Sequence, residues 1–187
     1  MAADHARPIV PPKAIKTDYP VIDTDPHIKR VFGYARKSDW AIGAGLAAVG
    51  PLLFAIAQRV QPVLAPPQTY TRCLRLACAI GATGGLITVY QRSCQRFLGF
   101  RENAREEAMD MREMVDKIKR GEPLYGESKL SPYMQGVAAR NSRYASLFSH
   151  AILWPNLVNH NQHGVDTAKY YRQAELELEA ERNGGTL

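Results

Sequence analysis

Apolar residues are concentrated in two runs near the middle of the chain, and polar residues dominate on either side of them. The first run extends from Trp40 to Gln58 without a charged residue, and the second extends from Leu76 to Gln91. A helix rises about 1.5 Å per residue, so roughly twenty residues cross a hydrocarbon core of about 30 Å. The pattern therefore predicts two transmembrane helices, at about residues 40–58 and 73–91, that form a hairpin.

The side chains at the ends of these runs fit a membrane. Arg75 and Arg92 flank the second run, where their aliphatic stems can lie in lipid while the charged groups reach the interface. Trp40, Tyr70 and Tyr90 also lie near the ends, as aromatic residues of the headgroup zone do. The alternative is a soluble protein with two buried helices. A soluble core helix normally carries a polar stripe, and the first run has none.

The remaining parts of the chain are too small for a large core of their own. They are a 39-residue arm, residues 1–39, and a C-terminal extension, residues 93–187, on either side of the hairpin at residues 40–92. The predicted fold class is therefore an all-α membrane protein with an extended N-terminal arm and a C-terminal extension of amphipathic helices. The net charge of +6 is typical of a protein that faces anionic lipid, and no nucleic-acid-binding motif accompanies it.

The N-terminal arm is predicted to be mostly extended because prolines interrupt it throughout. Asp25-Pro26 is nevertheless a helix-start signal, and Asp39 is a candidate cap for the first apolar helix. We interpret the arm as a segment that lies along a partner or the membrane surface; the alternative is a solvated linker. It contains no cleavable secretory signal and is rich in aspartate, so any mitochondrial import signal is expected to be internal.

The C-terminal extension is predicted to be helical in three segments. Apolar residues at steps of three and four predict one helix from about Ser93 to Arg120, ended by Gly121. A second helix is predicted from Ser131-Pro132 to about Leu153, and a third from Asp166 to Arg182. A group of carboxylates on the first helix is interpreted as a solvated face rather than a metal site: Glu102, Glu106, Glu107 and Asp110.

Several residue patterns suggest chemistry but lack its full requirements. The glycine-rich stretch 79–86 lacks the strand and last glycine of a nucleotide-binding turn. Three cysteines are too few for the usual ligands of an iron–sulfur cluster: Cys73, Cys78 and Cys94. Three histidines are interpreted as hydrogen-bonding loop residues rather than zinc ligands: His150, His160 and His163. No catalytic, cofactor-binding or metal site is predicted.

Small residues give the second apolar run a face suited to close helix packing. Gly81 and Gly85 are four residues apart, which lets another helix approach the backbone. That helix could be the first run or a neighbouring protein. Pro51 removes a backbone hydrogen bond within the first run and predicts a kink. Cations just before the first span and just after the second span slightly outnumber those of the connection between the spans. This difference predicts that both termini lie on the matrix-type side.

Two stretches carry a family resemblance. Tyr19–Trp40 (YPVIDTDPHIKRVFGYARKSDW) and Ser131–Gly164 (SPYMQGVAARNSRYASLFSHAILWPNLVNHNQHG) resemble the fungal accessory subunit of roughly 21 kDa of mitochondrial complex I, the NADH:ubiquinone oxidoreductase. The resemblance implies a non-catalytic, two-pass subunit of the mitochondrial inner membrane with no cofactor and no small-molecule substrate. Its implied partners are other complex I subunits, mainly in the membrane arm, and membrane lipids.

Two other functional classes remain as alternatives. A small membrane enzyme or carrier needs ionisable groups inside its spans, and neither uninterrupted apolar run contains one. An assembly factor of a mitochondrial membrane complex would share the sequence features of a resident subunit.

Overall fold

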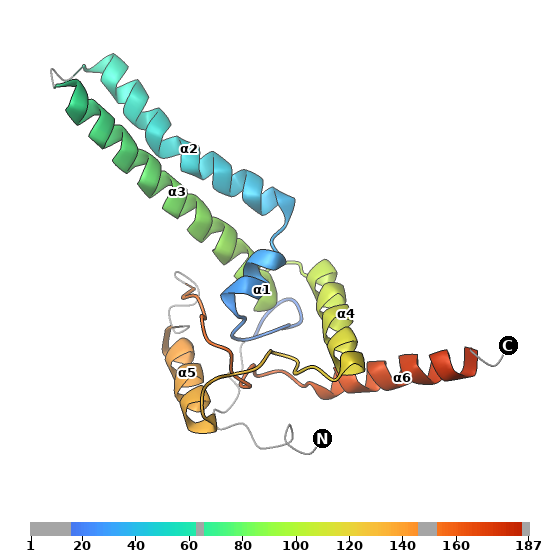
Figure 1. Cartoon of the computed structure of the whole chain (residues 1–187). Helices are drawn as coiled ribbons and strands as arrows, with labels where there is room; N and C mark the ends of the chain where they lie inside the picture. Colours follow the sequence, from blue (N-terminus) through green and yellow to red (C-terminus); the bar gives the residue numbers. More distant parts are fainter. Residues whose placement is uncertain (1–15, 63–65, 146–152, 185–187) are drawn as a thin grey trace. The chain divides into compact units, whose positions relative to one another are not determined.

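A computed structural model describes residues 16–62, 66–145 and 153–184. These residues form helices joined by loops and contain no β-strand, in agreement with the predicted all-α class (Figure 1). The helices are α1 (Ile28–Gly33), α2 (Lys37–Val60), α3 (Pro67–Phe97), α4 (Ala104–Arg120), α5 (Pro132–Ala145) and α6 (Ala168–Gly184).

The chain divides into two compact units. One unit is Val31–Cys94, which holds α2 and most of α3. The other combines the described residues of Met1–Arg30 and Gln95–Leu187, so the N-terminal arm belongs with the C-terminal extension. We refer to them as the helix-pair unit and the tail unit. The predicted division into residues 1–39, 40–92 and 93–187 remains a prediction.

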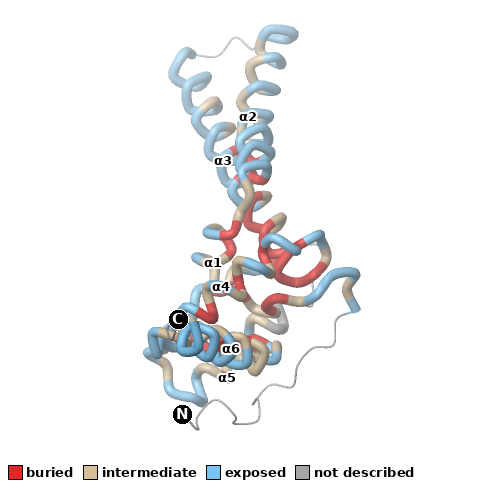
Figure 2. Tube along the Cα trace, turned by 90° about the vertical axis from the view of Figure 1, so that its right-hand side faces the viewer, coloured by how far each residue is buried: buried red, intermediate tan, exposed pale blue. Residues whose placement is uncertain are grey.

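The helix-pair unit is built from two long apolar helices. Both α2 and α3 are long and apolar enough to cross a membrane. Only 6% of the most apolar window of α2 and 17% of that of α3 is buried within the protein, and Figure 2 shows most of both helices as exposed. The helices extend beyond the predicted spans, because α2 already begins at Lys37 and the polar connection contributes the first turns of α3.

The prediction of one continuous helix from Ser93 to Arg120 is wrong. Residues up to Phe97 continue α3, and α4 begins only at Ala104. Gly99 interrupts the path with a φ of +76°, a left-handed conformation that favours glycine. The carbonyl oxygen of Tyr19 occupies the space that a side chain at Gly99 would need. The break is therefore shaped by a contact with the distant N-terminal arm, which helical periodicity along the sequence does not reveal.

The N-terminal arm is neither fully extended nor a solvated linker over its described residues, which begin at Lys16. It contains α1, and it crosses the α3–α4 break through backbone hydrogen bonds. The amide of Ile22 donates to the carbonyl of Phe97 at 2.9 Å, and the amide of Tyr19 donates to the carbonyl of Gly99 at 3.2 Å. Ile22 is almost fully buried. The prolines prevent a long helix in this arm, but the arm packs on the chain's own C-terminal half and buries Ile22 and Asp23 there.

The tail unit has a small core between α4 and α6. Three residues are buried together there: Met114 of α4, Tyr170 of α6, and Leu124 of the segment that follows α4. The predicted starts of the last two helices are close to those observed: α5 begins at Pro132, and Asp166 accepts a hydrogen bond from the Ala168 amide at 2.9 Å. The second segment is predicted to end at Leu153, whereas α5 is described as far as Ala145. Residues 146–152 lie outside the described residues.

Candidate interaction sites

The packing face of the helix-pair unit is made of small residues. Side chains built on Gly81 and Gly85 would collide with the carbonyl oxygens of Ala47 and Gly43, respectively. A side chain on Gly50 would lie 3.1 Å from the carbonyl oxygen of Ala77. Such close backbone approach lets dispersion forces and weak hydrogen bonds hold two helices without burying large side chains. The structure thus identifies α2 as the helix that the Gly81–Gly85 face contacts.

A buried ion pair closes one end of the same helix pair. Asp39 in the first turn of α2 is fully buried, and its Oδ1 accepts a hydrogen bond from Arg92 Nε of α3 at 2.9 Å. Its Oδ2 accepts from the backbone amide of Arg36 at 3.0 Å. Asp39 therefore caps the helix as predicted, although from inside its first turn, and it also links the two helices. The sequence pattern did not indicate the link to Arg92.

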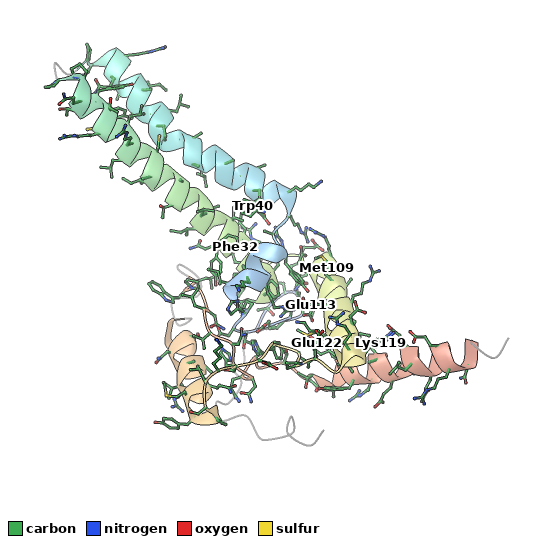
Figure 3. The ribbon with its side chains drawn as sticks, in the orientation of Figure 1. Phe32, Trp40, Met109, Glu113, Lys119 and Glu122 are labelled. Carbon is green, nitrogen blue, oxygen red and sulfur yellow. The ribbon has the colours of Figure 1, made fainter. Side chains whose placement is uncertain are left out.

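Aromatic rings surround this end of the pair. The ring of Phe32 packs against Trp40 of α2, with centroids 6.0 Å apart, and against Tyr90 of α3, with centroids 5.9 Å apart. Figure 3 shows Phe32 and Trp40 at the junction of α1 and α2. Trp40 remains half exposed while Tyr90 is buried. Two of the three residues predicted as interfacial, Trp40 and Tyr90, therefore differ in exposure, and Tyr90 is buried beside Phe32.

The tail unit holds a buried polar cluster that joins the N-terminal arm to the C-terminal loop. His163 Nδ1 lies 2.8 Å from Asp23 Oδ1, and His160 Nε2 lies 2.8 Å from Asp25 Oδ2. Asn156 adds a third tie, because its side-chain amide donates to the carbonyl of Asp25 at 3.1 Å. The rings of His160 and His163 stack with centroids 4.8 Å apart. Asn156, His160 and His163, the buried polar side chains of this loop, thus each meet a partner on the arm, as buried polar groups require.

The same cluster continues to α4 and α6 through Arg30 of α1. Its guanidinium contacts Asp23 Oδ2 at 3.3 Å and Asp110 Oδ1 at 2.5 Å, and the Tyr170 hydroxyl donates to Asp110 Oδ2 at 2.5 Å. Burial would raise the pKa of Asp23, but His163 and Arg30 outweigh it and hold that pKa below its usual value. Burial raises the pKa of Asp110 despite Tyr170 and Arg30. The arm, α4 and α6 therefore share one network of charges and hydrogen bonds.

The interpretation of the four carboxylates of residues 102–110 as a solvated face is wrong for two of them. Glu106 and Asp110 are buried, whereas Glu102 and Glu107 lie toward the surface. Asp110 faces inward because Arg30 and Tyr170, which are distant in sequence, supply its partners. Periodicity on one helix carries no signal for partners that come from other elements.

The histidines behave as hydrogen-bonding loop residues where the structure describes them. Both His160 and His163 are buried and hydrogen bonded, which confirms that interpretation, and their aspartate partners were missed. His150 lies outside the described residues. Over the parts that are described, no three histidine, cysteine or acidic side chains are grouped so that they could hold a metal ion.

The other candidate motifs are embedded in α3. Residues 79–86 lie in the middle of this continuous helix, so they do not form the turn between a strand and a helix that binds a nucleotide. Cys73 and Cys78 are exposed and Cys94 is buried, and the three are not joined in a disulfide.

Comparison with known proteins gives matches over nearly the whole chain. The family model described as NADH-ubiquinone oxidoreductase complex I, 21 kDa subunit, matches residues 16–102. The model described as the C-terminal of NADH-ubiquinone oxidoreductase 21 kDa subunit matches residues 111–187. The NADH-ubiquinone oxidoreductase 20.9 kDa subunit of Neurospora crassa is 55% identical over 172 residues, which cover 92% of this chain and 91% of that protein.

Proposed function

The chain belongs to the family of the 21 kDa subunit of NADH-ubiquinone oxidoreductase complex I, and we propose that it acts there as a non-catalytic accessory subunit of the membrane arm. This family membership confirms the resemblance inferred from residues 19–40 and 131–164. It makes the chain a subunit of the respiratory complex of the mitochondrial inner membrane, with other complex I subunits as its partners. Membrane lipids are further proposed partners, and we propose neither a nucleic acid nor a small-molecule substrate.

The exposure of the apolar helices is the observation that carries the membrane assignment. Leu53 on α2 and Ile80 on α3 are 60% and 64% exposed, and large apolar side chains on both helices share this exposure. The core helices of a soluble protein would bury them. Contiguous apolar surface of this extent needs lipid or other transmembrane helices around it. This supports a transmembrane hairpin formed by α2 and α3 over a soluble protein with two core helices.

The two units would have different structural roles. The hairpin would anchor the chain and pack laterally against the complex's membrane helices. The tail unit would contact neighbouring subunits outside the bilayer, with its arm, α4 and α6 held together by the buried polar cluster. A small membrane enzyme or carrier is disfavoured because the apolar runs contain no ionisable group for an intramembrane site. An assembly factor remains the alternative within the same complex.

A deletion strain tests the non-catalytic role. We expect loss of the chain to lower the amount of fully assembled complex I on native gels. Turnover of NADH per remaining assembled complex should stay near that of the parent strain. A normal amount of complex that has lost its turnover would contradict the proposal and indicate a catalytic contribution.

The orientation has its own test. We propose that both termini face the matrix, because cations near the spans are slightly more numerous on that side. Tags at either end should resist protease added to mitoplasts and become sensitive only after detergent. Digestion of either tag in intact mitoplasts would overturn this orientation.

A further inference from the structure

Two arginines project from α3 beside the apolar surface of α2. The contacts of Gly43 with Gly85, of Ala47 with Gly81 and of Gly50 with Ala77 show that α2 and α3 run antiparallel. Extending this register by equal rise along both helices places Arg75 about level with Leu53 and Arg72 about level with Ile56.

This level lies inside the apolar part of α2. Its uncharged run continues to Gln58, whereas the uncharged run of α3 begins only after Arg75. Leu52, Leu53 and Ile56 are 58%, 60% and 47% exposed, so α2 presents apolar surface at the depth where α3 presents cations. Measured along the helix axis, the register places Arg75 on the order of 7 Å from the level of Gln58, where the uncharged run of α2 ends. An arginine side chain can span that distance and reach the interface.

The helix pair provides no carboxylate for these cations. From Trp40 to Arg101 the sequence contains no aspartate or glutamate. Asp39, the acidic residue of the helix-pair unit, is buried at the opposite end and is bound by Arg92. Arg72 and Arg75 are exposed and three residues apart, so they share one face of α3, and Arg59 lies exposed in the last turn of α2 at the same end. Figure 1 shows this end of α2 beside the start of α3.

We propose that Arg72 and Arg75, with Arg59 beside them, bind the phosphate group of an anionic phospholipid at this end of the helix pair. Guanidinium groups bind phosphate oxygens through paired hydrogen bonds, and an arginine at the edge of the hydrocarbon core can extend its charged group to the level of the lipid phosphates. The exposed apolar side chains of α2 at the same level would contact the acyl chains. The inference rests on the proposed transmembrane placement of α2 and α3, and it specifies the lipid class and the residues that select it.

Lipid retention by the full chain tests the site. The chain is inserted into bilayers of phosphatidylcholine with a minority of phosphatidylglycerol, extracted in mild detergent, and its retained lipids are quantified by mass spectrometry. The unaltered chain should retain phosphatidylglycerol above its share in the bilayer. The double variant Arg72→Gln/Arg75→Gln should reduce this enrichment at least threefold, and Arg72→Lys/Arg75→Lys should restore only part of it.

A matched control removes the same charge elsewhere. Lys129→Gln/Arg182→Gln changes two exposed cations of the tail unit and should leave the enrichment unchanged. Equal enrichment in the Arg72→Gln/Arg75→Gln variant would overturn the proposal. If that variant keeps its lipid enrichment but fails to join complex I, the arginines contact an acidic partner protein instead of a lipid.

The failure of the lipid site can be told apart from failure of the proposed function. All variants are first tested for resistance to alkaline carbonate extraction. A chain that carbonate removes from the bilayer would contradict the transmembrane placement itself. A carbonate-resistant chain without anionic enrichment would contradict the lipid site alone.

Discussion

The helix-pair unit and the tail unit are held together mainly by different contacts, although a buried ion pair, Asp39–Arg92, closes one end of the helix pair. Between α2 and α3 the contact is made where side chains are missing, at Gly43, Gly81 and Gly85, and the large apolar side chains face outward. In the tail unit the contact is made by charged groups that are buried, around Arg30 and Asp110. The proposed membrane placement accounts for this difference. Lipid gives no hydrophobic driving force to helix association, whereas burial of apolar surface from water is favourable and a buried polar group without a partner is costly.

The buried cluster of the tail unit should be its most sensitive point. Asp110→Ala leaves Arg30 and the Tyr170 hydroxyl without their shared carboxylate, and breaking a buried pair costs about 3–5 kcal/mol. We expect amide hydrogen exchange in α4 and α6 of the full chain in mild detergent to accelerate strongly, while α2 and α3 stay unchanged. Glu179→Ala on the exposed face of α6 is the control. Equal exchange in both variants would show that the cluster does not stabilise the tail unit.

A smaller effect is expected from removing one hydroxyl of this cluster. Tyr170→Phe keeps the ring in the core and deletes the hydrogen bond to Asp110, a loss of about 1.5–3 kcal/mol for a bond to a charged group. Exchange in α6 should accelerate less than in Asp110→Ala. Combining the two substitutions should add little to Asp110→Ala alone, because both remove the same bond. Fully additive effects would contradict a shared network.

Along its glycine contact the helix pair should respond to added volume. Gly85→Leu places a side chain against Gly43, and overpacking of this kind costs about 1–3 kcal/mol. Gly84→Leu is a close control, since a side chain built there meets nothing within 4 Å. We expect Gly85→Leu to reduce the amount of chain recovered in complex I and Gly84→Leu to reduce it less. The opposite order would indicate that the exposed Gly84 face, and not the α2–α3 contact, governs incorporation.

The smallest effect is expected for a surface ion pair. Lys119 of α4 lies 2.8 Å from both Glu177 and Glu181 of α6, and these hydrogen bonds raise the pKa of the lysine. Figure 3 shows Lys119 at the end of α4 that lies beside α6. Because water and salt screen such pairs, Lys119→Gln should leave hydrogen exchange in α4 and α6 nearly unchanged. A change as large as that of Tyr170→Phe would show that this contact matters more than its exposure implies.

The two regions also differ in how well the sequence predicts them. The apolar runs, the Gly81–Gly85 face and the capping role of Asp39 follow from local patterns, and the structure agrees with each. The helix break at Gly99 and the burial of Asp110 do not follow, because their causes are Tyr19, Arg30 and Tyr170, which come from other parts of the chain. Local spacing predicts which helices form, but it does not tell which distant polar residues become partners.

The proposed function requires that this chain is a structural part of the respiratory complex. Separation of mildly solubilised mitochondrial membranes by native size, with detection of the chain and of NADH dehydrogenase activity in each fraction, tests it most directly. We expect the chain to comigrate with assembled, active complex I and to be depleted from small species. A chain found near its own mass of 20.8 kDa and absent from the active complex would overturn the proposed function.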